Sequence, residues 1–201
     1  MAIDTIFFDL GGVLVNFSHE KMCDNISRFS GIPLPKVKQI IYDEKVGANY
    51  ERGTIDSRQV HQIFTREAKK PLDFLDFLDA SSDIFSVKEE MIPLIENLSE
   101  QDVSLFLLSN TSEAHFFYIV KHFPHLLVPF DGFILSYEVK AAKPEKAIYE
   151  AALETAETTP EKSFYTDDVL DYVEAAQKLG IKGHHFQEAE KLQKALTCIG
   201  L

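Results

Sequence analysis

The chain has 201 residues and a formal net charge of −12, with 45% hydrophobic and 26% charged residues. This length suits one domain, or one domain with a sizeable insertion, and folding buries roughly 70% of the surface of such a chain. Because nucleic acids and anionic membranes bind Lys and Arg, the acidic balance argues against both as partners.

The two cysteines give no sign of a disulfide framework or a zinc site. Cys23 and Cys198 lie far apart in the chain, which favours a reducing compartment. The first apolar run is too short for a signal peptide, and no apolar stretch approaches the ~20 residues of a membrane span. We therefore expect a cytoplasmic protein; the sequence is silent on its oligomeric state.

Short apolar runs alternate with helical patterns along most of the chain. The runs predict strands at 5–8, 103–108, 133–135, 163–166 and 183–186. The periodic segments predict helices at 88–98, 112–121, 145–155, 171–179 and 188–197. This alternation is typical of right-handed βαβ units, so we expect an α/β fold whose parallel sheet carries helices on both faces.

Residues 16–88 interrupt the alternation and contain no predicted strand. Helical periodicity covers 19–29, 34–45, 56–68 and 72–85. Proline and glycine separate these segments, as expected between helices. We therefore expect a core made of residues 1–15 and 89–201, with residues 16–88 inserted as a helical cap.

Polar side chains follow the predicted strands in four short segments. They are Asp9 in FFDLGGVLV, Ser109 and Asn110 in LLSNT, Lys143 in AAKPE, and the pair Asp167–Asp168 in FYTDDV. Each alone is also compatible with a helix cap or a solvated loop. Together and in this order they indicate a site, because ligands of open α/β sheets bind at the carboxyl ends of the strands.

These side chains supply the parts of phosphoryl transfer. A carboxylate such as Asp9 can attack phosphorus and form an acyl-phosphate. Mg²⁺ prefers oxygen ligands, which Asp9 and Asp168 offer, with Asp167 in or just behind the coordination shell. Ser109 and Asn110 can hold phosphate oxygens, and Lys143 can stabilise the charge of the transition state.

On these motifs the chain resembles the haloacid dehalogenase-like hydrolase superfamily. FFDLGGVLV, YERGTI, LLSNT, AAKPEKAIYE and DDxxxxxxA resemble the branch of sugar-phosphate phosphatases and epoxide hydrolase N-terminal domains, over residues 4 to about 186. The resemblance implies a Rossmann-like core and a cap that closes over the site. It also implies a Mg²⁺-dependent phosphatase of a small phosphorylated metabolite, for which a sugar phosphate is one candidate, acting through an aspartyl-phosphate.

The resemblance assigns a role to each matching residue. The nucleophile falls on Asp9, the phosphate ligands on Ser109 and Asn110, and the third-motif lysine on Lys143. The metal ligands fall on Asp167 and Asp168, with Asp168 the direct one. The backbone carbonyl of Gly11 completes the metal site that the resemblance implies.

Two positions depart from the common pattern. Gly11 stands where most phosphatases of the family carry a second Asp, whose acid–base help is worth ~10²–10⁴-fold. Tyr172 stands where the fourth motif commonly has Asn. His19 and His115 lie near motif ends and are candidates for the missing acid, although surface or helix-end histidines are the simpler interpretation.

Three functions remain open from the sequence. The first is the phosphatase. The second is a metal-independent 2-haloacid dehalogenase, which needs no proton for its leaving halide but leaves Asp167 and Asp168 clustered without a cation. The third is a member that binds a phosphorylated ligand or a protein without turnover, because Gly11 replaces the acid. In the cap, Glu51–Gly53 either faces the site or only caps a helix.

Overall fold

The computed structural model describes residues 2–201 and contains one parallel sheet of five strands. The sheet has the order β5-β4-β1-β6-β7, with β1 at its centre. Its strands are β1 (Thr5–Phe8), β4 (Ser104–Ser109), β5 (Gly132–Leu135), β6 (Ser163–Asp167) and β7 (Lys182–His185). These strands confirm the predicted α/β class, and each lies within two residues of its predicted run.

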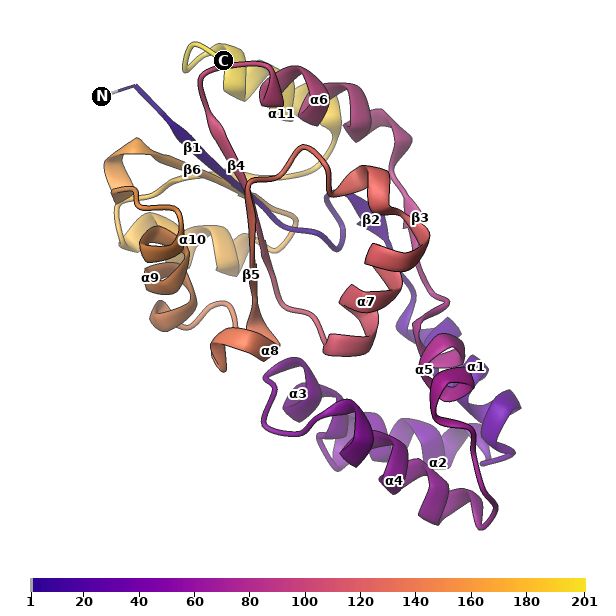
Figure 1. Cartoon of the computed structure of the whole chain (residues 1–201). Coiled ribbons are helices and arrows are strands. Elements are labelled where there is room, and N and C mark those ends of the chain that lie inside the picture. The colour runs from indigo at the N-terminus through magenta and orange to yellow at the C-terminus, as the bar shows by residue number, and fades with distance from the viewer. Residues whose placement is uncertain (1) are drawn as a thin grey trace.

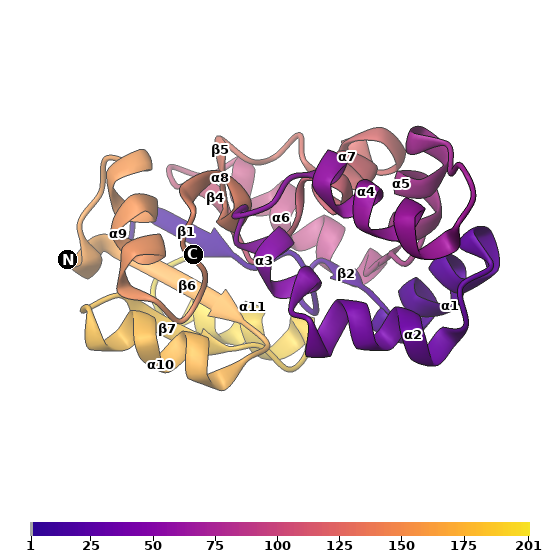
Figure 2. The same ribbon diagram turned by 90° about the horizontal axis from the view of Figure 1, so that it is seen from below.

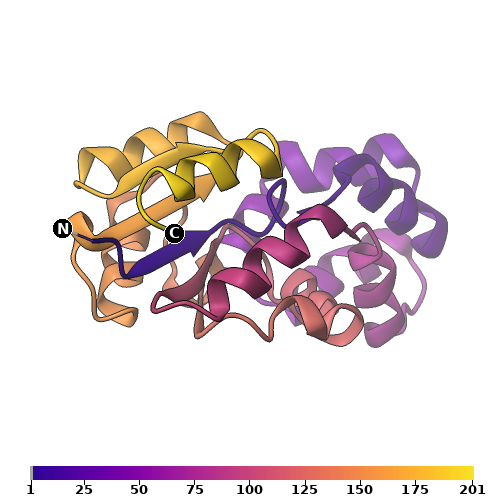
Figure 3. The same cartoon turned by 90° about the horizontal axis from the view of Figure 1, so that it is seen from above.

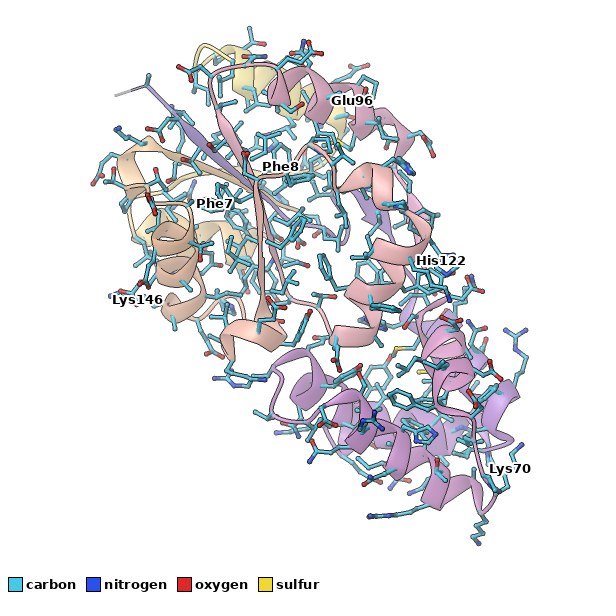
Figure 4. The ribbon with its side chains drawn as sticks, viewed as in Figure 1. Phe7, Phe8, Lys70, Glu96, His122 and Lys146 are labelled. Carbon is cyan, nitrogen blue, oxygen red and sulfur yellow. The ribbon has the colours of Figure 1, made fainter. Side chains whose placement is uncertain are left out.

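Helices cover both faces of this sheet. Successive side chains of β1 point to opposite faces and all of them are buried, so each face needs a layer of helices. Ile6 and Phe8 pack with one layer of helices, and Phe7 packs with the other. The first layer contains α6 (Ile92–Ser99), α7 (Glu113–His122) and α11 (Ala189–Thr197), and the second contains α9 (Lys146–Thr155) and α10 (Leu170–Lys178). Figure 4 shows Phe7 and Phe8 inside the core, and Lys146 and Glu96 at its periphery.

The segment between β1 and the rest of the core forms a helical lobe, which we call the cap. Its helices are α1 (His19–Ser30), α2 (Leu34–Lys38), α3 (Val46–Glu51), α4 (Ser57–Ala68) and α5 (Phe74–Ser82). They enclose a hydrophobic core of their own, which includes Ile26, Phe64 and Phe77. Figure 1 shows this lobe beside the sheet, with Lys70 at its far tip in Figure 4.

The structure corrects two details of the predicted cap. Residues 16–88 are not free of strands, because β2 (Val15–Asn16) and β3 (Ser86–Val87) pair antiparallel where the chain enters and leaves the cap. The single helix expected at 34–45 is instead α2 followed by a π-helical turn, Gln39–Asp43, and the chain then turns at Lys45, whose φ of 58° is left-handed. The helix α3 that follows was not predicted. We keep the division at residues 16 and 88 as a proposal.

The carboxyl ends of the strands point toward the cap. Figure 2 shows the arrowheads of β1 and β6 directed at the cap helices, and Figure 3 shows the same for β1 from the opposite side. The remaining short helices of the core are Glu89–Met91, Pro124–Leu126, α8 (Ser136–Val139) and Pro160–Lys162. None of the helices in residues 2–201 is long and apolar enough to cross a membrane.

Candidate active site

The loop after β1 places Asp9 between the sheet and the cap. The Asp9 amide donates to the Thr166 carbonyl at 3.0 Å, so the loop starts in register with β6. Three residues later Gly12 adopts a φ of 75°, and a Cβ there would lie 2.1 Å from Asp168 Oδ2. The second glycine of FFDLGGVLV is therefore required both by its backbone conformation and by the approach of Asp168.

Lys143 joins the two buried carboxylates of the site. Its Nζ lies 2.8 Å from Asp9 Oδ1 and 2.7 Å from Asp167 Oδ2, and it donates to the Leu108 carbonyl at 3.0 Å. The three donors of the ammonium group are thus all used. Lys143 does not directly follow a strand as its predicted position implied, because α8 lies between β5 and its loop. Its side chain is nevertheless only 1% exposed.

The carboxylates of Asp9, Asp167 and Asp168 converge, with ligand atoms within 4.8 Å of one another. Asp167 is fully buried, and its oxygens accept from Lys143, from the Tyr165 hydroxyl and, at 2.8 Å, from the Val169 amide. Asp168 is exposed to the site. Three carboxylates therefore converge on one buried ammonium group, that of Lys143, and the charge of Lys88 also acts on Asp168. A divalent cation would relieve the repulsion among these carboxylates.

Burial dominates the titration of these groups. It raises the pKa of Asp9 to about 7; the charge of Asp167 adds to the rise, and Lys143 opposes it. Burial alone would lower the pKa of Lys143, but the carboxylates of Asp9 and Asp167 hold that pKa above its ordinary value. Burial and the charge of Asp167 also raise the pKa of Asp168. Lys143 therefore remains a cation inside the site.

Ser109 and Asn110 both lie beside Asp9 but have different surroundings. Ser109 ends β4 and lines the same pocket as Asp9. The Asn110 side chain instead holds the backbone of Lys143, accepting from its amide at 2.8 Å and donating to its carbonyl at 3.0 Å. These two bonds position Lys143. The phosphate-binding roles expected for Ser109 and Asn110 stay predictions, and Ser109 has the hydroxyl that lines the pocket beside Asp9.

Phe17 occupies the space beside Gly11. A Cβ on Gly11 would lie 2.9 Å from Phe17 Cε1 and 3.2 Å from Phe17 Cδ1. Phe17 also lines the pocket that contains Asp9, with its ring 5.1 Å from the ring of His19. The position where an aspartate side chain would reach into the site is therefore covered by an aromatic ring.

Tyr172 covers the buried end of Lys143. The Lys143 ammonium lies 5.3 Å from the centre of the Tyr172 ring, within the range of a cation–π contact. The Tyr172 carbonyl accepts from the Tyr149 hydroxyl at 2.8 Å, and this bond joins the first turn of α10 to α9. At this departure from the common pattern, an aromatic face contacts Lys143.

The cap contributes the opposite wall of a pocket of about 200 Å³ that opens onto Asp9, Ser109 and Lys143. Glu51 and His19 line this wall together with Phe17, and His115 lines the same pocket from α7 of the core. Burial lowers the pKa of both histidines, for His115 to about 4. At neutral pH both rings are therefore uncharged, which makes them poor replacements for the missing acid.

Glu51 is a site residue whose role the sequence left undecided. Burial raises its pKa to about 7. Its backbone carbonyl accepts from Ser136 Oγ at 2.6 Å, so the end of α3 is docked on α8 of the core. Of the two readings of Glu51–Gly53, the structure supports a turn that faces the site. The motif YERGTI was the only sequence signal for it.

The same turn is held against the core by further contacts. Lys140 Nζ donates to the Gly53 carbonyl at 2.6 Å, and Arg52 pairs with Glu145 through both of its terminal nitrogens. A Cβ on Gly53 would lie 2.1 Å from the Tyr137 carbonyl oxygen. The glycine therefore permits the close approach of cap and core.

Comparison with known proteins shows the family of the chain. The haloacid dehalogenase-like hydrolase family matches residues 3–180. A sesquiterpene phosphatase of Aspergillus oryzae, astK, is 26% identical over 90% of this chain and 89% of its own length. A phosphatase of Mycobacterium tuberculosis, MT3486, is 20% identical over 92% of this chain and 87% of its own length.

Solved structures agree with the fold and include one with ligands. A HAD family enzyme of Bacteroides thetaiotaomicron matches with a TM-score of 0.85 and 26% identity, covering 98% of this chain and 99% of that one. The same enzyme was crystallised with magnesium and inorganic phosphate, and this form matches with a TM-score of 0.79 and 26% identity over 94% and 98% of the two chains.

Proposed function

We propose that this chain, which belongs to the haloacid dehalogenase-like hydrolases, is a magnesium-dependent phosphatase of a small phosphorylated metabolite. The observation that carries the proposal is the contact of one buried lysine with Asp9 and Asp167, beside Asp168 and Ser109. This arrangement offers a nucleophile, a fixed cation and a phosphate ligand in one pocket. The relatives named phosphatases support the same reaction class.

The residues present fit a divalent cation. Asp9 and Asp168 offer carboxylate oxygens, and Gly11 lies in the same pocket with its backbone. Asp167 would stand behind them, because Lys143, Tyr165 and Val169 already bind its oxygens. Mg²⁺ in this position would neutralise repulsion between the Asp9 carboxylate and an anionic phosphoryl group.

The chain's own residues would then perform the transfer. The Asp9 carboxylate attacks phosphorus and forms an aspartyl-phosphate while the alcohol leaves, and water hydrolyses this intermediate in a second step. Lys143 stabilises the ionised form of Asp9 and the charge of the transition state, and Ser109 holds a phosphate oxygen. Asn110 fixes the backbone of Lys143 through its two hydrogen bonds.

The dehalogenase alternative has less support. A solved L-2-haloacid dehalogenase of Xanthobacter autotrophicus matches with a TM-score of 0.63 at 17% identity, a likeness of the fold alone. A reaction without a metal would leave the carboxylates of Asp9 and Asp168 close together without a cation between them, because Lys143 pairs with Asp9 and Asp167. The carboxylate cluster therefore favours phosphoryl transfer.

The test is hydrolysis of p-nitrophenyl phosphate with and without Mg²⁺. We expect turnover that needs Mg²⁺ and is lost in Asp9→Asn, while Asp102→Asn, a change at an exposed position, retains it. Absence of turnover with every phosphate ester and metal would favour the binding member without catalysis. Release of chloride from a 2-chloroacid without metal would select the dehalogenase.

We also propose the cytoplasm as the location of the protein. Cys23 and Cys198 are both free thiols, as expected in a reducing compartment.

A further inference from the structure

The cap contains an apolar cavity of about 280 Å³. Its wall includes Met22, Ile26, Val60, Phe64 and Phe77, which belong to the hydrophobic core of the cap. Protein interiors are close-packed, and apolar cavities of about half this volume stay dry and bind small aromatic molecules. A space of this size in so small a lobe is therefore a candidate binding site.

The cavity adjoins the catalytic pocket. Glu51, His19 and His115 line both spaces. On the cap side of the catalytic pocket, Phe17, Ile84 and Phe85 extend the apolar surface. A ligand whose phosphate lies at Asp9 and Lys143 would thus direct its organic group past Glu51 into the cap.

Most polar groups around the cavity already have partners. The Tyr50 hydroxyl lies 2.6 Å from Ser57 Oγ and accepts from the Ala114 amide at 3.0 Å. Ser81 Oγ donates to the Leu78 carbonyl at 3.0 Å. A sugar would bring several hydroxyl groups that need hydrogen bonds, whereas a hydrocarbon group needs none.

We propose that the cap cavity binds the hydrocarbon group of the substrate, which is the phosphate monoester of an apolar alcohol rather than a sugar phosphate. This inference rests on the proposed phosphatase function and names the substrate class of the same site. It also gives Phe17 a role, because an aromatic ring beside the phosphate suits an apolar leaving group better than a charged side chain does.

The test is a series of n-alkyl phosphates from ethyl to octyl, compared with glucose 6-phosphate, which is also the ester of a primary alcohol. The n-alkanols have nearly equal acidity, so differences in kcat/KM along the series report binding of the chain and not the chemistry of the leaving group. We expect kcat/KM to rise about fourfold for each methylene until the cavity is full. A flat series, or a preference for the sugar phosphate, would overturn the proposal.

A variant links the effect to the cavity. Val60→Phe places a larger side chain in the cavity, so we expect a smaller octyl-to-ethyl ratio of kcat/KM. Leu75→Phe introduces the same aromatic side chain at a cap position that is 67% exposed and should leave this ratio unchanged. An unchanged ratio in Val60→Phe would refute the assignment of the cavity.

Two further measurements keep the outcomes separate. If Val60→Phe does not fold, inhibition of the wild-type enzyme by the product alcohols tests the cavity instead. We expect 1-hexanol to inhibit at least tenfold better than ethanol. Equal inhibition by the two alcohols would count against the cavity. Failure of the proposed function itself would appear as no hydrolysis of any ester, p-nitrophenyl phosphate included. Hydrolysis with no dependence on chain length would overturn only the substrate class.

A second inference concerns the proton that Gly11 cannot supply. Glu51 is a carboxyl group from the cap that lines both the catalytic pocket and the cap cavity. If the phosphate lies at Asp9 and the hydrocarbon group lies in the cavity, the ester oxygen between them lies in the region that Glu51 borders. The other titratable groups that line these spaces are His19, Tyr42 and Tyr50 from the cap and Asp9, His115, Lys143, Asp168 and Tyr172 from the core.

We infer that Glu51 is the general acid and base of this phosphatase. As the bond from Asp9 Oδ to phosphorus forms and the bond from phosphorus to the ester oxygen breaks, the Glu51 carboxyl gives its proton to that oxygen. The resulting carboxylate then takes a proton from the water that attacks the aspartyl-phosphate, which returns Asp9 and Glu51 to their starting forms. Burial, which keeps the pKa of Glu51 at about 7, makes both steps available near neutral pH.

Glu51→Gln tests this role through the leaving group. Alkyl phosphates, whose alcohols are basic, should lose ~10²–10⁴-fold in rate, and p-nitrophenyl phosphate, which leaves without a proton, less than tenfold. An equal loss for both substrates would indicate a structural role and overturn the inference, as would no loss at all. Glu44→Gln, at an exposed cap position, is the matched control.

Discussion

Replacing Lys143 by methionine should destabilise the protein, because the positive charge of the lysine compensates the buried carboxylates of Asp9 and Asp167. Its ammonium group lies 2.8 Å from Asp9 and 2.7 Å from Asp167, with the lysine side chain 1% exposed. Removing one partner of such a buried ion pair typically costs about 3–5 kcal/mol, since the remaining charge is left without compensation. For a protein whose total stability is of the order of 5–15 kcal/mol, this is a large part.

The sign of the pH dependence follows from the same contacts. Without Lys143, the folded-state pKa of Asp9 rises above the already raised value of about 7, whereas an aspartate in the unfolded chain titrates near 3.8. A raised folded-state pKa costs stability as pH increases, because the unfolded chain releases the proton first. The deficit of Lys143→Met should therefore be larger at pH 8 than at pH 5.

Urea unfolding followed by far-ultraviolet circular dichroism measures this deficit. We expect a lower midpoint with an unchanged slope, which indicates a stability effect rather than a change in the unfolded state. Lys162→Met is the control, because its ion pair with Asp4 is exposed and should be worth less than about 1 kcal/mol. A loss below about 1 kcal/mol for Lys143→Met, or one that does not grow with pH, would refute the reasoning.

Three other predictions follow from the loop, the cap and the histidines. Gly12→Ala should lower the activity and should lower the stability by at least about 1–2 kcal/mol, because the φ of this residue is 75° and a Cβ would collide with Asp168. Thermal unfolding measures the stability and Mg²⁺-dependent turnover measures the activity. A fully active variant would contradict this prediction. Gly53→Ala should displace the cap turn from the Tyr137 carbonyl. We expect a lower kcat/KM and faster cleavage of the turn in limited proteolysis. Unchanged kinetics would argue against a turn docked on the core. His115 has a folded-state pKa of about 4, below its unfolded value of 6.5, so it should remove up to about 3 kcal/mol of stability as pH falls from 6.5 to 4. His115→Gln should reduce that slope in urea unfolding, and an equal slope in the variant would show that other groups set it.

The fold and most of the site follow from local patterns. Runs such as Thr5–Phe8 are apolar and short, and strands that are buried on both faces require such runs. Asp9, Ser109 and Asp167 lie at the ends of such strands, so their meeting could be predicted from the parallel topology alone.

The rest depends on contacts between distant segments. Asn110 bonds the backbone of Lys143, a partner 33 residues away that no local pattern identifies. The helix α3 has only six residues, and contacts with the core hold its end, including the bond from Ser136 Oγ to the Glu51 carbonyl. The linker strands β2 and β3 have two residues each and pair across the whole cap. Elements this short carry almost no periodicity in the sequence.

The contact between Gly11 and Phe17 has a consequence for the evolution of this enzyme. A side chain at position 11 would displace the ring at position 17, so we expect the effect of a substitution at one position to depend on the residue at the other. An aspartate at position 11 would require the Phe17 ring, which is 44% exposed, to turn away or to be replaced by a smaller side chain. Relatives with an acid at the first position should therefore carry a smaller residue at the second, and the pair should change together across the family.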